Sequence, residues 1–445
     1  MMKTRTALAG AAVVVGILGA AAAAASGIVP MTGPAATAPS TGAPSSTAPS
    51  PTGVTLRPVD GGPDYYSRFT GGLPTDPEFF PLGVWLESVV DRSNVTLDAE
   101  AGLNTYVELT ADSDVQLARD SGMYAIPAFT HASASGFVLS DEVDMWAGPG
   151  NAAWSGKYPG EGPICAAEST ECGYTIQKER RAAATPGAML YANYGKGVAF
   201  WESDEEALGF FNQTQDLVSA DTYWFTDPYI CARTEGGAVI GYTRDLTPEE
   251  CRLAANYGWT VERIRKLNNA ASPVWAFVEV GHPFQDAPEA TTITGPQIRA
   301  AVWSSLIHGA RGVIYFNHSF GGQCPTQHVL RDCKGDVRQT VTDLNKHLKD
   351  LAPVLNAPFL DGATTVTGPA DVATKLHNGK VYVFAGANKS TGGTVTFTMK
   401  CGGSTAVVLN ENRTVPVVDG TFTDTFADGN AVHLYSIDGG TSCGH

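Results

Sequence analysis

Two short acidic motifs contain the residues best suited to do chemistry. In LSDEVD (139–144) Asp141 and Glu142 follow an apolar run, and in VWAFVEVGHP (274–283) Glu279 interrupts one. One carboxylic acid can protonate the oxygen that leaves an acetal, while a second carboxylate attacks the anomeric carbon or activates a water molecule. A charge within an apolar strand is expensive to bury without a partner, so Glu279 favours a catalytic role over a structural ion pair.

Further polar and aromatic residues stand at the ends of similar apolar runs. Aromatic rings bind the apolar face of a sugar, and Tyr, His and Asn side chains can bind its hydroxyls. We therefore expect substrate contacts from Trp85, Asp141, Asp221, Tyr223, Trp224, His282, Asn317 and His318. For the aromatic residues and the histidines, the alternative is a place in the core or at a rim. Glu87 and Glu108 also end such runs, and we expect them to be salt-bridged or solvated.

The runs that must position these residues alternate with helical patterns. Strands are predicted at 80–88, 103–110, 123–130, 136–144, 188–194, 216–224, 273–281 and 312–320. Helices are predicted at 113–121, 175–185, 204–214, 247–267, 296–309 and 341–355. Repeated strand–helix units predict an α/β fold, a (β/α)₈ TIM barrel, whose reactive groups lie at the carboxyl ends of the strands. HASAS (131–135) is too short for a crossover helix, so either that helix is reduced to a turn or a neighbouring strand is misplaced.

In these motifs the sequence resembles clan A of the retaining glycoside hydrolases. That resemblance implies an acid/base glutamate at the end of strand four, here Glu142, and a nucleophilic glutamate at the end of strand seven, here Glu279. Retention further implies carboxyl groups about 5 to 5.5 Å apart. Many clan members have Asn before the acid/base, where this chain has Asp141. Asp141 could bind the sugar's 2-hydroxyl, raise the pKa of Glu142 by like-charge repulsion, or itself be the acid.

Composition divides the chain into four parts. Residues 1–26 have the basic start, apolar run and small-residue end of a signal peptide, with an uncleaved membrane anchor as the alternative. Residues 27–60, rich in Pro, Ala, Ser and Thr, are predicted to be a disordered linker that could hold the protein at a cell surface. The barrel should occupy 61–360. Period-two alternation from 361 to 445 predicts a small antiparallel β-sandwich.

Eight cysteines suit an oxidising compartment and predict disulfides. Four sequential pairs are the simplest arrangement: Cys165–Cys172, Cys231–Cys251, Cys324–Cys333 and Cys401–Cys443. The alternative is a zinc site, but the sequence has no Cys-x-x-Cys and its histidines are scattered. We therefore expect no metal.

Several functional classes are disfavoured. The chain has 45 acidic and 29 basic residues, a net charge of −16, which opposes nucleic acid binding. It has no glycine-rich phosphate loop, Gly-x-Ser-x-Gly or His-Glu-x-x-His, which argues against nucleotide transfer, serine esterase and zinc protease chemistry. A lyase or deacetylase would need a metal site or a Tyr/Lys base that no motif supplies.

The remaining hypothesis is a secreted, retaining glycoside hydrolase that acts on an extracellular or cell-envelope polysaccharide or glycoconjugate. It needs no cofactor and no stable protein partner. The alternative is a non-catalytic carbohydrate-binding or cell-envelope protein on the same barrel.

Overall fold

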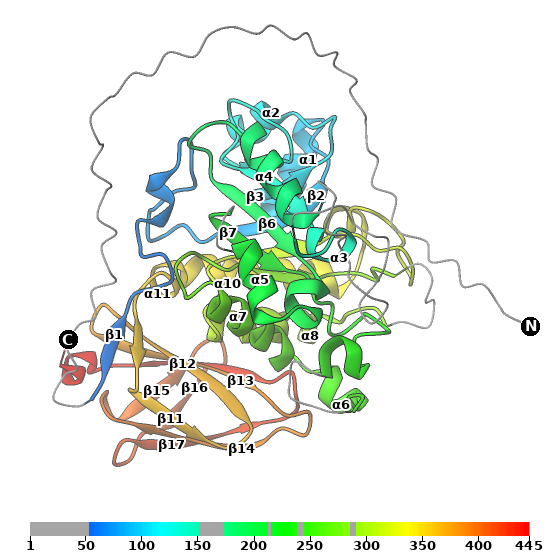
Figure 1. Ribbon diagram of the computed structural model, residues 1–445. Helices are drawn as coiled ribbons and strands as arrows, with labels where there is room; N and C mark the ends of the chain where they lie inside the picture. The colour runs from blue at the N-terminus through cyan, green and yellow to red at the C-terminus, as the bar shows by residue number, and fades with distance from the viewer. Residues whose placement is uncertain (1–52, 151–171, 212–214, 238–243, 285–290, 445) are drawn as a thin grey trace, which may run out of the picture. The chain divides into compact units, whose positions relative to one another are not determined.

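The computed structural model describes residues 53–150, 172–211, 215–237, 244–284 and 291–444 (Figure 1). The expected signal peptide and most of the expected linker lie outside these residues, as does Cys165. Within the described ranges, no helix combines the length and the apolar character needed to cross a membrane.

The expected (β/α)₈ barrel is confirmed. Its strands are β2 (Leu82–Glu87), β3 (Thr105–Leu109), β4 (Tyr124–Ile126), β5 (Phe137–Asp141), β6 (Leu190–Tyr194), β7 (Leu217–Ala220), β8 (Ala276–Glu279) and β9 (Val313–Phe316). They pair in parallel in the orders β4-β3-β2-β9-β8 and β5-β6-β7. The amide of Val138 donates to Pro127 O (2.9 Å) and that of Trp275 to Val218 O (2.9 Å), which joins the two groups into a closed barrel.

Helices follow most of the strands. They are α1 (Arg92–Glu100), α2 (Val115–Asp120), α3 (Val143–Trp146), α4 (Gly173–Ala183), α5 (Asp204–Phe211), α6 (Pro248–Cys251), α7 (Ala255–Leu267), α8 (Gly295–Ile307), α9 (Val329–Asp332), α10 (Asp336–Asp350) and α11 (Ala352–Leu355), with short helical turns η1 (Tyr65–Arg68), η2 (Gly197–Trp201), η3 (Arg233–Gly237) and η4 (Gly440–Cys443). Helix α1 was not expected, because it buries only Val95 and Asp98 and so lacks an apolar stripe. Its start is nevertheless well capped, since the Asp91 carboxylate accepts from the amides of Ser93 and Asn94.

The third crossover helix is reduced to a turn. Between β4 and β5 the chain makes a single turn in which Ala134 N donates to His131 O. Arg180 of α4 reaches the backbone of this region, because its guanidinium donates to Ala128 O (3.0 Å) after β4 and to Val138 O (3.2 Å) and Leu139 O (3.1 Å) within β5. Buried carbonyls without donors would be costly, so this one side chain replaces part of what the missing helix would cover.

Large side chains fill the barrel interior. Trp85, expected to bind substrate, is one of them: it is 2% exposed and its ring lies 5.3 Å from Phe277 and 6.1 Å from Tyr191. Its place in β2 turns the indole toward these rings in the barrel interior, and substrate contact by Trp85 stays a prediction. At the amino end, the indole of Trp275 donates to the hydroxyl of Tyr66 (3.0 Å), so residues from η1 close the barrel floor.

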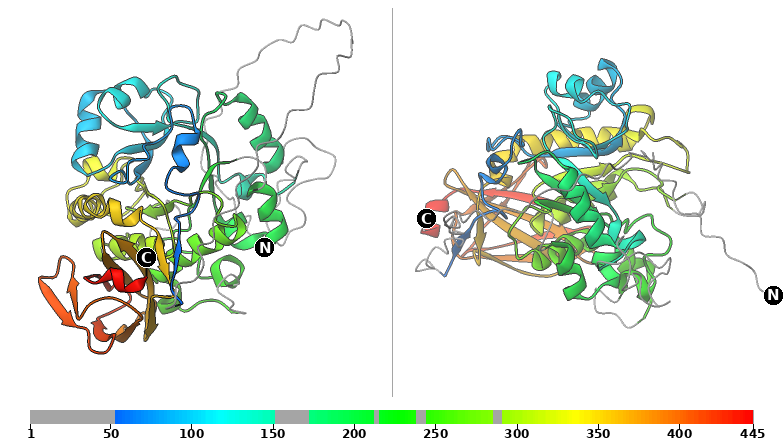
Figure 2. Two further views of the ribbon diagram at one scale, coloured as in Figure 1. Left: turned by 90° about the vertical axis from the view of Figure 1, so that its left-hand side faces the viewer. Right: turned by 45° about the horizontal axis from the view of Figure 1, so that its top comes forward.

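The carboxyl-terminal part is an antiparallel sandwich. One sheet has the order β1-β10-β12-β13-β18-β15-β16 and the other β11-β14-β17. The strands are β1 (Thr55–Arg57), β10 (Phe359–Asp361), β11 (Thr364–Thr367), β12 (Ala370–His377), β13 (Lys380–Ala387), β14 (Gly393–Met399), β15 (Thr405–Val408), β16 (Arg413–Pro416), β17 (Thr421–Phe426) and β18 (Val432–Ile437). Helix α8 packs on β13, with the rings of Trp303 and Phe384 5.2 Å apart (Figure 2).

Two expected boundaries shift. The linker was expected to extend to residue 60, but Thr55–Arg57 forms β1 and pairs with β10, which itself begins at Phe359 rather than at 361. The Asp60 carboxylate also accepts from Arg265 (Nη2, 2.9 Å). A three-residue strand next to a Pro-rich tract has too little alternation to be recognised, and its partner lies about 300 residues further along the chain.

Three of the expected disulfides are present: Cys231–Cys251, Cys324–Cys333 and Cys401–Cys443. The fourth expected pair involves Cys165 and so falls outside the described residues.

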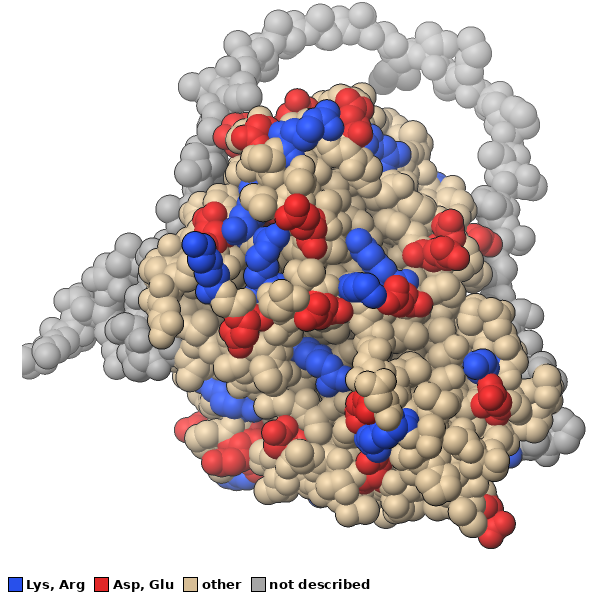
Figure 3. All heavy atoms as spheres, turned by 180° about the vertical axis from the view of Figure 1, so that it is seen from behind, with Lys and Arg blue, Asp and Glu red and all other residues tan. Residues whose placement is uncertain are grey.

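On the face shown in Figure 3, basic side chains are interspersed with acidic ones. The acidic surplus of the chain therefore does not form a single-sign patch on that face.

Candidate active site

Polar side chains meet where β5, β6 and β7 end. These strands are adjacent and parallel, so their carboxyl ends share one edge. Asn193 on β6 donates from Nδ2 to Asp141 Oδ1 (2.9 Å), and Ser219 on β7 donates to Asn193 Oδ1 (2.5 Å). Burial raises the pKa of Asp141, and the bond from Asn193 opposes that rise. The Asp141 carboxyl is thus held in a fixed orientation at the barrel mouth.

Glu142 stands at a sharp turn beyond β5. Its φ is 48°, in the left-handed region that few residues other than Gly adopt, and its amide donates to Asn193 O (3.0 Å). Burial, and then the neighbouring charges of Asp141 and Asp144, raise the pKa of Glu142 to about 8. Asp221 lies close enough for the charge of Glu142 to raise the pKa of the Asp221 carboxyl. Because like charges repel, this group of carboxyls favours a proton on Glu142 or Asp221.

The third acid of the motif, Asp144, has a structural role. It is fully buried, and its carboxylate accepts from the amides of Gly195 (3.0 Å) and Val198 (2.7 Å). These bonds satisfy the free amides at the start of η2. Gly197 is needed beside it, because a Cβ there would lie 2.7 Å from Asp144 O. Asp144 therefore anchors the turn that carries Glu142.

Asp221 follows β7 and faces the same group. It is 6% exposed, and its Oδ2 accepts from the hydroxyl of Tyr223 (3.0 Å). Burial, and then the charges of Glu142 and Asp141, raise the pKa of Asp221 well above its ordinary value. Asp141, Glu142 and Asp221, expected from the sequence to serve one site, do lie together.

Glu279, at the end of β8, forms a separate network. Its Oε1 accepts from the hydroxyls of Tyr257 (2.6 Å) and Thr226 (3.3 Å), and its Oε2 has no hydrogen-bond partner among the described residues. Burial raises the pKa of Glu279 to about 7, while the two hydroxyls act in the opposite direction. Because the barrel strands are parallel, Glu279 and Glu142 lie at the same end of the barrel.

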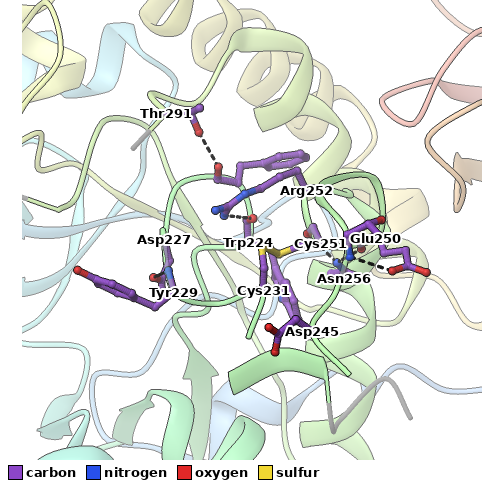
Figure 4. The surroundings of a disulfide bond; sticks show 12 residues. Trp224, Asp227, Tyr229, Cys231, Asp245, Glu250, Cys251, Arg252, Asn256 and Thr291 are labelled. Carbon is purple, nitrogen blue, oxygen red and sulfur yellow. Dashed lines mark hydrogen bonds between the residues drawn. A yellow bond between two sulfur atoms is a disulfide. The ribbon is translucent and has the colours of Figure 1, made fainter. Parts of the chain in front are cut away.

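A disulfide supports the loop that supplies Thr226 (Figure 4). Cys231 is bonded to Cys251 at the end of α6, and the next residue, Arg252, donates to Trp224 O (2.8 Å). Thr291 donates to Phe225 O (2.8 Å) from the opposite side. Two segments thus fix the backbone just before Thr226, which limits how far its hydroxyl can move from Glu279.

Aromatic rings form an apolar wall beside the acids. Tyr223 is partly exposed, and its ring lies 5.2 Å from Phe316, 6.3 Å from Phe277 and 6.2 Å from Phe284. His318 is 5% exposed and stands behind Phe316 (5.1 Å). Burial lowers the pKa of His318, so its imidazole is neutral at pH 7. Tyr223 and Phe316 can therefore offer a sugar an apolar surface next to Asp221.

Three other residues expected to bind substrate are buried and have polar partners inside the protein. Trp224 is fully buried and its Nε1 donates to Thr260 on α7 (3.0 Å), so it is a core residue. Asn317 is also fully buried: its amide donates to Glu87 and its Oδ1 accepts from Leu330 N (2.8 Å). His282 is 1% exposed, and its Nδ1 lies 3.4 Å from Thr292 Oγ1. All three side chains are closed to solvent, and substrate contact by them stays a prediction.

Glu87 and Glu108, both expected to be salt-bridged or solvated, have different surroundings. Glu87 forms a salt bridge with Arg331 (2.8 Å), as expected. Glu108 instead has a φ of 50°, and burial and then Asp141 raise its pKa. It therefore belongs to the acidic group of Asp141.

Four contributing residues were not identified from the sequence: Glu108, Asn193, Thr226 and Tyr257. Asn193 had a usable signal, a polar side chain near the end of the apolar run AMLYANY. Thr226 and Tyr257 had none, since each reaches Glu279 from a segment remote in sequence. No group of three or more metal-binding side chains occurs in the part of the chain described.

Comparison with known proteins gives structural resemblances alone. No protein-family profile matches the chain, and no curated protein does. Among solved structures it is similar to an α-amylase from Geobacillus thermoleovorans complexed with acarbose (TM-score 0.48, 9% identity, 81% of this chain and 98% of that one). It is also similar to a glycoside hydrolase family 30 subfamily 8 xylanase from Clostridium acetobutylicum (TM-score 0.40, 12% identity, 80% and 96%). Function is therefore argued from the site itself.

Proposed function

We propose that the protein is a glycoside hydrolase that retains anomeric configuration, with Glu142 as acid/base and Glu279 as nucleophile. The observation that carries the proposal is the contrast between two buried glutamates at one end of the barrel. Glu142 is buried beside Asp141 and Asp144, whose charges raise its pKa, while Glu279 has one oxygen held by hydroxyls and the other without a partner among the described residues. One group is thus prepared to donate a proton and the other to attack.

In the first step Glu142 protonates the glycosidic oxygen as that bond breaks, and Glu279 Oε2 bonds to the anomeric carbon. In the second step the Glu142 carboxylate takes a proton from water, which attacks the same carbon and releases Glu279. The like charge of Asp141 raises the pKa of Glu142 and so keeps the proton on it until the leaving oxygen needs it. Tyr257 and Thr226 fix Glu279 Oε1, so Oε2 remains available.

The proposed substrate is an extracellular or cell-envelope polysaccharide or glycoconjugate. The predicted signal peptide supports secretion, and three disulfides are compatible with an oxidising compartment. A mature amino terminus near residue 27, determined by mass spectrometry of protein from the culture medium, would test this part of the proposal.

The direct test is a screen of the wild-type protein against aryl glycosides and soluble polysaccharides, with products identified by mass spectrometry. Proton NMR of the first product formed then determines its anomeric configuration. A product with the substrate's configuration supports the proposal, whereas an inverted product contradicts the role of Glu279 as nucleophile. Binding without release of sugar would favour a non-catalytic carbohydrate-binding protein.

The pH profile of kcat/KM should be a narrow bell. Glu279 must be ionised, which requires a pH above its pKa of about 7, and Glu142 must be protonated, which requires a pH below about 8. In Asp141→Asn the loss of a neighbouring negative charge should lower the pKa of Glu142 and move the basic limb to lower pH. Asp120→Asn, at an exposed site on α2, is the control and should leave both limbs in place. A basic limb that does not move in Asp141→Asn would contradict this assignment.

Tyr257→Phe should shift the other limb. The lost hydroxyl favours the ionised form of Glu279, so its removal should raise the pKa of Glu279 and move the acidic limb to higher pH. Tyr174→Phe is the control, because the hydroxyl of Tyr174 donates to the backbone oxygen of Glu206 and to neither Glu142 nor Glu279. Equal profiles for wild type and Tyr257→Phe would show that Glu279 does not set the acidic limb.

A further inference from the structure

A tryptophan next to the proposed acid is exposed to solvent. Trp146, the last residue of α3, is 45% exposed, and Tyr229 at 51% is the other strongly exposed aromatic residue in the described ranges. Large aromatic rings usually lose most of their surface to the core on folding, since that burial is favourable. An indole left in water at the mouth of a barrel can offer a ligand a large apolar face.

The ring of Trp146 is held in place. Its Nε1 donates to Asp141 O (2.7 Å), which uses the single hydrogen-bond donor of the indole on the strand that carries the acids. Its backbone amide donates to Glu142 O (3.2 Å). The neighbouring Met145 takes the inner side of the turn, against Gly195, where a Cβ would lie 2.2 Å from Met145 Sδ. What remains exposed on Trp146 is therefore an apolar and immobilised surface, which loses little entropy when a ligand stacks on it.

The position of this surface identifies its ligand. Glu142 must reach the glycosidic oxygen, which joins the sugar attacked by Glu279 to the sugar that leaves. Trp146 is one helical turn beyond Glu142 and belongs to the same turn as the acid, whereas Glu279 approaches from β8. A ring fixed to the acid's own turn is therefore better placed for the leaving part of the substrate than for the part bound to Glu279.

We propose that Trp146 is a stacking platform for the sugar unit on the leaving-group side of the cleaved bond. The proposal rests on the proposed function and deepens it, because it assigns the substrate to oligosaccharides and polysaccharides. A glycoside with a small, non-aromatic leaving group would gain nothing from this surface.

The test compares a polymer with a substrate that has no leaving sugar. Wild type, Trp146→Ala and Trp146→Phe are assayed on the soluble polysaccharide cleaved best among xylan, starch, carboxymethylcellulose and β-glucan, and on the glycosyl fluoride of its sugar. Tyr229→Ala is the matched control, since it removes an equally exposed aromatic ring from a different loop. Binding is measured separately by native electrophoresis in gels that contain each polysaccharide.

Trp146→Ala should lower kcat/KM on the polymer roughly tenfold, the factor that about 1.4 kcal/mol of lost contact gives. It should retain wild-type activity on the fluoride. Trp146→Phe should retain most polymer activity, and Tyr229→Ala should equal wild type on both substrates. Unchanged polymer activity in Trp146→Ala, an equal loss on the fluoride, or an equal loss in Tyr229→Ala would each overturn the platform.

The gels separate failure of the platform from failure of the proposed function. A wild-type protein that binds a polysaccharide but cleaves none contradicts the hydrolase. In that case weaker retardation of Trp146→Ala than of wild type supports a binding role for Trp146, and equal retardation contradicts it. A wild-type protein that neither binds nor cleaves any of the four polymers overturns the platform as well.

Discussion

Glu279→Gln should lower kcat/KM by at least about 10³-fold on every substrate that the wild type cleaves. The amide keeps the size of the side chain but cannot attack the anomeric carbon, and loss of a catalytic nucleophile typically costs several orders of magnitude. The measurement is the initial rate on an activated aryl glycoside, because that substrate depends least on the acid. In Glu279→Ala, azide should restore turnover and give a glycosyl azide of inverted configuration.

The chain offers a close control in Glu87→Gln. Glu87 and Glu279 both end barrel strands and both are fully buried, but Glu87 is bonded to Arg331 and Asn317. Glu87→Gln should lower the melting temperature and leave kcat near wild type. If Glu279→Gln kept more than a tenth of the wild-type activity, or if Glu87→Gln lost as much activity as Glu279→Gln, Glu279 would not be the nucleophile.

Glu142→Ala should show a loss that depends on the leaving group. With a polysaccharide, whose leaving alkoxide needs a proton, the rate should fall by about 10² to 10⁴, the usual contribution of a general acid. With a 2,4-dinitrophenyl glycoside, whose leaving group needs no proton, formation of the glycosyl-enzyme should continue at nearly the wild-type rate. The measurement is a set of rates on aryl glycosides whose leaving groups differ in pKa.

The same series on Asp141→Ala distinguishes the acid from its neighbour. A steep dependence on the leaving group in Glu142→Ala, with a uniform loss in Asp141→Ala, assigns the proton to Glu142 and a positioning role to Asp141. The opposite result would make Asp141 the acid. Azide should accelerate Glu142→Ala and give a glycosyl azide of retained configuration, because the small anion occupies the space of the missing carboxylate.

The fold was largely predictable because its units are local. All eight barrel strands fall within the predicted runs, since apolar segments between turn signals depend only on nearby residues. Among the elements that were not predicted, two show how a weak local signal hides an element. Helix α1 has almost no apolar stripe, and β1 exists only because β10 pairs with it.

The site was predictable in part for a related reason. Asp141, Glu142, Asp221 and Glu279 stand at strand ends, so the barrel topology brings them to one end. The direction in which a side chain faces depends on one residue of register, and this is why Trp85, Trp224 and Asn317 lie in the core or in internal hydrogen bonds. Tyr257 contacts Glu279 from a helix 22 residues earlier, and no feature of its own segment indicates this contact.

The pairing of β1 with β10 has a consequence for the order in which the chain folds. Arg57 and Asp361 lie 304 residues apart in sequence, yet the Nε of Arg57 donates to the Asp361 carboxylate (2.7 Å). During synthesis the first strand therefore has no partner until the whole barrel has emerged. Contacts of such long range form late, because closing a large loop costs entropy before any contact stabilises it. Thr55–Arg57 thus stays unpaired and accessible to proteases and chaperones until β10 is made, and its docking marks a molecule whose barrel strands have all been synthesised.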